Sequence, residues 1–157
     1  MQTAVFLIMN LLRDKNIVKI LTALKQAGRG DVVNVAGKWG AFGPLLASRV
    51  SAELGKNLVY VCSHIDDADK ASDDLHVFCK EKVEIFPAWE GIEDIADATD
   101  EIRSERLRVA MKAFKADQNF ALVTSIQALC QPVASAEDIQ SKRYSLSRGA
   151  EPGLDEV

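Results

Sequence analysis

Two short runs of apolar residues limit what this chain can fold into more than any other feature. Leu58–Cys62 and Phe120–Thr124 contain no charged side chain and are rich in valine and aromatic residues. Such runs are typical of strands that are covered on both faces of a parallel sheet. Val83–Phe86, which Pro87 ends, predicts a third strand. The β-branched run Val32–Val35 predicts a strand that precedes these three.

Segments with helical periodicity separate these runs. Apolar residues spaced three or four positions apart predict one helix over 17–24 and another over 45–54, which Gly55 ends. Ser63 predicts the cap of a third helix, and a fourth lies between the last two strands. A last helical turn follows the final strand, through Ile126 and Leu129. The buried faces of the third and fourth helices are predicted to be, respectively, Ile65, Ala68, Ser72, Leu75 and Cys79, and Leu107, Ala110, Met111 and Phe114.

Strands that alternate with helices indicate an α/β domain over residues 1–132, with a largely parallel sheet of about four strands. Residues 133–157 are polar and offer only Tyr144–Leu146 as a possible strand. We expect a linker there, or the start of a following domain. The apolar segment Ala4–Leu12 is too short to span a bilayer. It predicts a helix that packs on this domain or on a neighbour.

A glycine-rich stretch, Gly37–Pro44, follows Val32–Val35 and leads into the helix over 45–54. Strand, glycine turn and helix in this order are the setting of a phosphate-binding loop. Gly37 and Gly40 take the places of turn glycines, while Gly43 and Pro44 fall where the phosphate lysine and the magnesium-binding hydroxyl belong. Glycine and proline supply neither group. The sequence therefore predicts a degenerate phosphate loop that holds no cofactor.

Charge and cysteine content disfavour other classes of site. The net charge is −4, and the chain has no basic stripe beyond Arg103, Arg106 and Arg108, so autonomous DNA binding is disfavoured. The three cysteines form no C-x-x-C pair, which favours buried thiols in a reducing cytoplasm over a zinc site or disulfides.

No metal or catalytic residue is predicted either. The acidic residues between Glu90 and Asp100 have no histidine partner, so a solvated loop is the better interpretation. His64 and His76 are far apart and lack the context of a nucleophile.

Three further strings carry a resemblance to a known family. Phe86–Glu90 reads F-P-A-W-E, Glu101–Leu107 reads E-I-R-S-E-R-L, and Ala121–Leu129 reads A-L-V-T-S-I-Q-A-L. In this order they resemble the N-terminal module of bacterial transcription-repair coupling factors, which is similar to the first domain of UvrB. The resemblance covers most of residues 15–132. It departs from the family between Glu90 and Glu101, where prolines are common in the family and none is present here.

The resemblance implies a P-loop NTPase-like fold whose phosphate loop has lost its lysine. It implies a non-catalytic scaffold in transcription-coupled nucleotide excision repair, linked to the recruitment of UvrA and to other domains of the coupling factor. The family's ATPase motor and UvrA-binding domain lie outside this chain. An alternative is a nucleotide-binding, helicase-type domain with an unconventional loop. A DNA-binding module is a third interpretation, and it predicts affinity that falls steeply with salt.

Several side chains are candidates for interaction. Trp89 either covers one end of the sheet or contacts a partner, together with Glu90 beside it. Arg106 is expected to form an exposed ion pair with Glu101 or Glu105, which contributes at most about 1 kcal/mol. In the glycine stretch, Lys38 is expected to be solvated and Trp39 to fill the vacated phosphate pocket.

Overall fold

The computed structural model describes residues 14–80, 82–89, 100–115 and 120–142. Within them, three strands form one parallel sheet: β1 (Leu58–Cys62), β2 (Val83–Phe86) and β3 (Ala121–Ser125). The strand order is β1-β3-β2, so the last strand in the sequence lies in the centre. The predicted α/β class and the three later strands are confirmed.

The predicted strand at Val32–Val35 is wrong. Residues 31–39 form no β-ladder. Val33 and Val35 instead line an apolar cavity of about 430 Å³ with side chains of two helices, α2 (Lys15–Gln26) and α3 (Phe42–Leu54). Val33 and Val35 therefore pack beside these two helices rather than in a sheet. The third valine of the run, Val32, is 79% exposed.

The helix ends follow from local chemistry. The Asp14 side chain accepts hydrogen bonds from the first turn of α2, and Gly55 ends α3 in the left-handed conformation with φ of 59°, as predicted. Helix α4 (Ile65–Phe78) begins one residue later than predicted, because His64 rather than Ser63 occupies the cap position, without a side-chain hydrogen bond.

Among the described residues after β2, three helices follow: α5 (Asp100–Lys115), α6 (Ile126–Cys130) and α7 (Ala136–Ser141). Ser125 caps α6 and Ser135 caps α7 through their hydroxyl groups. Helix α7 was not predicted, because residues 136–141 have no apolar periodicity. The predictions for Ala4–Leu12 and Tyr144–Leu146 lie outside the described residues. None of the described helices is long and apolar enough to cross a bilayer.

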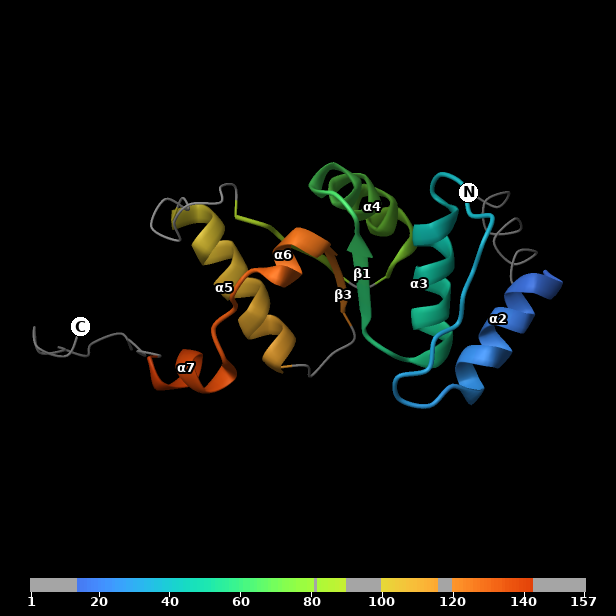
Figure 1. The fold of residues 1–157 in the computed structure, drawn as a ribbon, viewed down its shortest axis with the longest axis horizontal. Coiled ribbons are helices and arrows are strands. Elements are labelled where there is room, and N and C mark those ends of the chain that lie inside the picture. Colours follow the sequence, from blue (N-terminus) through green and yellow to red (C-terminus); the bar gives the residue numbers. More distant parts are fainter. Residues whose placement is uncertain (1–13, 81, 90–99, 116–119, 143–157) are drawn as a thin grey trace, which may run out of the picture.

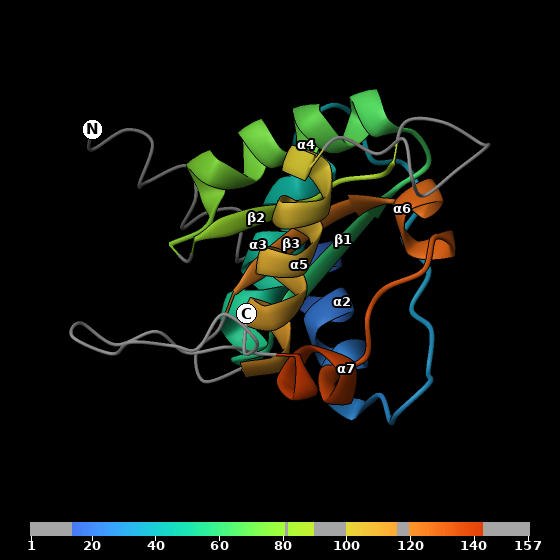
Figure 2. The same ribbon diagram turned by 90° about the vertical axis from the view of Figure 1, so that its left-hand side faces the viewer.

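The sheet separates two hydrophobic clusters. Helix α4 packs across all three strands, and α3 packs beside it on β1. Helix α5 lies on the other face, over β2, as Figure 2 shows with α5 in front of the sheet and α3 behind it. The first cluster centres on Leu75 and Val123, which are fully buried. The second joins Phe86, Ala88, Val109 and Ala128.

One face of β1 remains open, contrary to the prediction that this strand is covered on both faces. The side chains of Val59 and Val61 are 52% and 45% exposed. Strand β1 lies at the edge of the sheet opposite β2, so α5 does not reach it (Figure 1).

The predicted buried faces of the helices are confirmed only in part. In α4, Ala68, Ser72 and Leu75 are buried, but Ile65 is exposed and Cys79 is half-buried. In α5, Ala110 is buried, while Leu107 and Phe114 are exposed and Arg106 and Val109 take the central positions. Helix α5 thus turns an arginine toward the sheet. The predicted helical turn through Ile126 and Leu129 is confirmed as α6, and both side chains are exposed.

Candidate functional site

The glycine stretch forms a turn that runs directly into α3. Gly37 and Gly40 have positive φ angles of 74° and 49°, and the N–H of Phe42 donates to the Trp39 carbonyl at 3.1 Å. Gly43 and Pro44 lie in the first turn of α3, where the missing N–H of proline costs no helical hydrogen bond. Because no strand precedes this turn, the strand–loop–helix geometry of a phosphate-binding loop is absent among the described residues.

Tyr60 explains why residue 43 is a glycine. A Cβ atom at Gly43 would lie 2.8 Å from the Tyr60 hydroxyl, closer than real Cβ atoms approach other atoms. Tyr60 extends from β1 toward α3 and fills the place where a side chain at position 43 would begin. The position that a phosphate lysine would occupy is therefore closed by packing.

A cavity of about 580 Å³ lies beside this turn, at the carboxyl end of β1. Gly40, Ala41 and Pro44 form one side of it and Tyr60 and Cys62 another. Its charged side chains, all on α4, are three aspartates and one lysine: Asp67, Lys70, Asp73 and Asp74. A net acidic lining repels a polyphosphate.

The two titratable groups of β1 in this cavity remain neutral at pH 7. Burial, with the nearby Cys62 and Asp74, raises the pKa of Tyr60. Burial and Asp67 raise the pKa of the Cys62 thiol, against a smaller opposite effect of Lys38. Thiols with a raised pKa are poor nucleophiles, so Cys62 is not an activated cysteine. Cys62 is buried as predicted, whereas Cys130 is exposed.

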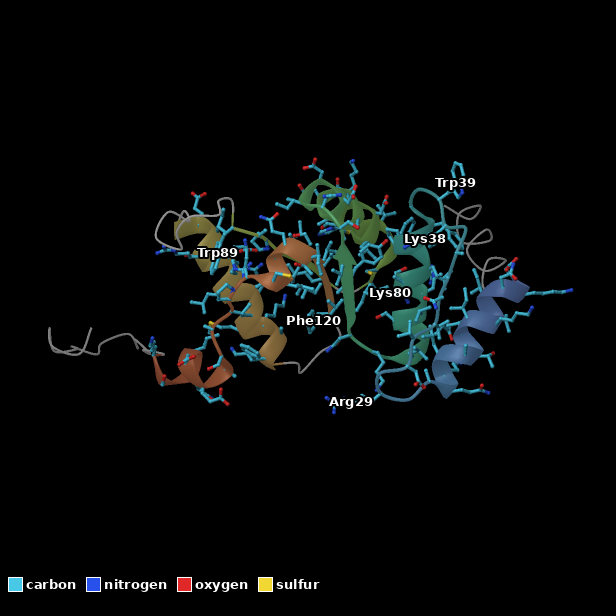
Figure 3. All side chains as sticks on the ribbon, in the orientation of Figure 1. Arg29, Lys38, Trp39, Lys80, Trp89 and Phe120 are labelled. Atoms are coloured by element: carbon cyan, nitrogen blue, oxygen red, sulfur yellow. The ribbon has the colours of Figure 1, made fainter. Side chains whose placement is uncertain are left out.

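Trp39 does not fill a pocket, contrary to prediction. Its side chain is 87% exposed, and Figure 3 shows it pointing away from the domain near α3. Lys38 is exposed, as predicted. The second tryptophan, Trp89, lies on the other side of the molecule, beside α5 and α6 (Figure 3).

Arg106 organises the surroundings of Trp89. Its side chain is 4% exposed, and its guanidinium carbon lies 4.2 Å from the centre of the Phe86 ring and 4.4 Å from that of Trp89. Nη1 donates to the carbonyl of Pro87, and Nη2 donates to the carbonyl of Pro132 at 3.1 Å. We call Phe86, Pro87, Trp89, Arg106, Ala128, Gln131 and Pro132 the Arg106 cluster.

Trp89 is fixed in this cluster by Gln131. The backbone N–H of Trp89 donates to Oε1 of Gln131 at 2.7 Å, and its carbonyl accepts from Nε2 at 3.1 Å. The Trp89 indole Nε1 is buried and has no hydrogen-bond partner in the described part of the chain. Arg106 thus joins Trp89 to Phe86, the last residue of β2, and Trp89 also lines a cavity of about 380 Å³. Contact of Trp89 with a partner stays a prediction.

The prediction that Arg106 forms an ion pair with Glu101 or Glu105 is wrong. Among the described residues, no carboxylate lies within salt-bridge distance of Arg106, and Glu105 pairs instead with Arg108 at 2.6 Å. Glu101 is exposed, and Glu90 lies outside the described residues. Burial lowers the pKa of Arg106, but a guanidinium remains charged at every physiological pH. Carbonyl dipoles and ring faces therefore stabilise its charge.

The burial of the Glu84 carboxylate was not predicted from the sequence. Its side chain is 3% exposed and contacts Arg108 at 2.5 Å, Lys82 at 3.2 Å and Lys112. Burial alone raises the pKa of Glu84, but hydrogen bonds from these three cations outweigh it and lower the pKa to about 2. The available signal was a charged residue within an apolar strand, followed downstream by Arg108 and Lys112 at helical spacing.

The described residues contain no group of histidine, cysteine or acidic side chains that could hold a metal ion. A comparison with protein-family models, curated proteins and solved structures found no match to this chain.

Proposed function

We propose that this chain is a UvrB-like N-terminal module of a transcription-repair coupling factor. It would serve nucleotide excision repair in the cytoplasm as a non-catalytic scaffold that is linked to UvrA recruitment. In this proposal its partners are UvrA and the other domains of the coupling factor, and contact with DNA is weak or made through those domains.

The Arg106 cluster is the observation that carries this proposal. The three strings on which the resemblance depends lie far apart in the sequence, yet each contributes to the cluster. Phe86 and Trp89 come from the first string, Arg106 from the second and Ala128 from the third. A shared physical role explains why these residue types occur together, which supports the resemblance more strongly than any one string does.

The surroundings of the glycine turn favour a scaffold over a nucleotide-binding enzyme. Tyr60 closes the space at Gly43, and the adjacent cavity is acidic. Polyphosphate binding needs backbone N–H groups and a cation that point at the same oxygen atoms. The alternative, a nucleotide-binding domain with an unconventional loop, would have to bind ATP against this charge.

Calorimetric titration with ATP and Mg²⁺ separates the two functions. We expect no saturable heat at about 1 mM ATP, a concentration that half fills a site of millimolar affinity. Saturable binding in the micromolar range would overturn the scaffold proposal. Titration of the chain with Asp73→Asn and Asp74→Asn is the matched control, because it reduces the acidic charge without altering the turn.

Binding to purified partners tests the scaffold itself. We expect the immobilised chain to bind UvrA or an N-terminally truncated coupling factor in a saturable manner. Leu107→Glu places a charge on an exposed apolar residue beside the Arg106 cluster. Val77→Glu makes the same change at an exposed valine of α4, away from this cluster. Stronger loss of binding for Leu107→Glu supports an interface there, whereas no binding of the unmodified chain to either partner contradicts the proposal.

A further inference from the structure

The two edges of the sheet differ in how they resist pairing with another strand. At the β2 edge, Glu84 points inward to a cluster of Arg108 and Lys112, with Lys82 at the start of the strand. An inward-pointing charge on an edge strand is one of the devices by which proteins prevent edge-to-edge association. A strand docking beside β2 would have to approach these charges. The β2 edge is therefore protected.

The β1 edge has no such protection. Leu58–Cys62 contains no charged residue, proline or glycine, and Val59 and Val61 expose β-branched side chains on the face that α5 leaves open. Figure 1 shows β1 at the front of the sheet, and within the described part of the chain no strand pairs with its outer side.

The ladder determines which backbone groups face outward. The N–H of Leu58 donates to the Phe120 carbonyl at 3.0 Å, so Leu58 faces β3. Because alternate residues of a strand in a parallel ladder bond to opposite sides, Tyr60 and Cys62 also face β3. Val59 and Val61 then direct their N–H and C=O groups away from the sheet. The same two residues thus present hydrogen-bonding groups sideways and apolar side chains on the open face.

We propose that the free edge of β1 binds an extended strand of a partner polypeptide, which hydrogen-bonds to Val59 and Val61 and extends the sheet in parallel. Addition of a strand to an exposed edge is a common mode of peptide recognition, in which main-chain bonds supply affinity. The side chains of the partner strand on the open face are apolar, since they pack beside the two valines.

Charges at the two ends of β1 define the partner further. Lys56 is exposed two residues before the strand, and Asp66 is exposed in the first turn of α4, four residues after the strand. A parallel partner strand therefore carries an acidic residue at its start and a basic residue at its end. This arrangement does not depend on the function proposed above.

A second copy of this chain fits the edge less well than a different partner. Two β1 strands related by an axis normal to the sheet would keep all four valines on one open face. The exposed apolar surface would then be doubled rather than covered. A partner strand that continues into a helix covers this face, as α5 covers the same face at β2.

The probe is a synthetic peptide built on β3, a strand that this sheet already accepts in parallel on both sides. Its sequence is acetyl-Glu-Phe-Ala-Leu-Val-Thr-Lys-Lys-amide. Two control peptides are N-methylated, one at Ala and Val and the other at Leu and Thr. Since only one set of N–H groups faces β1, one control is expected to bind like the probe and the other not at all.

Amide hydrogen exchange of the whole chain, followed by NMR, is the measurement. With the probe at about 1 mM, exchange at Val59 and Val61 is expected to slow at least about tenfold, with little change at Tyr60. Val61→Pro removes one outward N–H and is expected to abolish this protection, while Val77→Ala on α4 preserves it.

Three results would overturn the proposal. The first is unchanged exchange at Val59 and Val61 with the probe. The second is equal binding of the two methylated peptides, which remains decisive even if Val61→Pro does not fold. The third is protection of Val59 and Val61 that rises with chain concentration in the absence of peptide, together with a dimer in analytical ultracentrifugation. That outcome would assign the edge to a second copy.

Discussion

Replacement of Arg106 by alanine is expected to destabilise the domain by about 3–5 kcal/mol. Two carbonyls, those of Pro87 and Pro132, lose a bond from a charged donor, which costs about 1.5–3 kcal/mol each. Contacts with the rings of Phe86 and Trp89 contribute about 0.5–2 kcal/mol each. The sum of these terms is an upper limit, because the contacts share one side chain and the site relaxes.

Arg106→Lys is the more informative variant, because it keeps the charge. Lysine lacks the planar fork that reaches two carbonyls and stacks between two rings, so we expect a loss of about 2 kcal/mol. The same loss for lysine and alanine would mean that geometry rather than charge supports the cluster.

Urea denaturation followed by circular dichroism measures the loss of stability, and tryptophan emission locates it. Trp39→Phe leaves Trp89 as the single tryptophan, and Trp39 is solvent-exposed, so this background is expected to be neutral. Emission from Trp89 is expected to shift to the red in Arg106→Lys.

Arg29→Ala is the matched control. Arg29 is an exposed arginine in the turn after α2, and its removal is expected to change stability by less than about 0.5 kcal/mol. A loss below about 1 kcal/mol for Arg106→Ala, or an unchanged Trp89 emission in Arg106→Lys, would refute the assignment of Arg106 as the organising residue.

Three further predictions concern Glu84, the contact between Gly43 and Tyr60, and Gly55. Glu84 has a pKa of about 2 in the folded chain, below its ordinary value of 4.5, so it stabilises the fold above pH 4.5 and loses this effect as the pH falls toward 2. Because solvent screens its partly exposed cations, we expect the free energy of unfolding to fall by about 1–2 kcal/mol between pH 4.5 and pH 2, measured by thermal denaturation. Glu84→Gln is expected to remove this pH dependence. Gly43→Ala brings a Cβ against the Tyr60 hydroxyl and is expected to cost about 1–3 kcal/mol in urea melts. Tyr60→Phe should recover part of that cost, and purely additive effects would contradict the contact. Gly55→Ala forces alanine into the left-handed region and is expected to lower stability by about 1 kcal/mol, measured by thermal denaturation.

Much of the local structure could be predicted from the sequence. The apolar runs at 58–62, 83–86 and 120–124 are strands to within a residue, because their residue types favour extended backbone wherever they are placed. The end of α3 at Gly55 follows from the conformational freedom of glycine at one position. The same reasoning was wrong at Val32–Val35, whose valines pack against helices instead of a strand.

For the candidate site, the sequence identified the segments that contribute residues but not the contacts between them. Gly37, Gly40, Gly43 and Pro44 are in a turn that enters a helix, but the closed space at Gly43 depends on Tyr60 in another element. Arg106 was expected at the surface because charged residues are rarely buried without partners. Its partners are mainly backbone carbonyls, which are present in every sequence and so leave no signal.

By itself, the sequence determined the class of the fold and the positions of its strands and most of its helices. These depend on residues within a few positions of one another. Only the tertiary structure decided that β1 is an edge with an open face, that Glu84 is buried among cations, and that Arg106 joins segments 19 and 26 residues away. The physical reason is that burial and pairing are properties of side chains brought together by the chain path, and residue type alone does not specify that path.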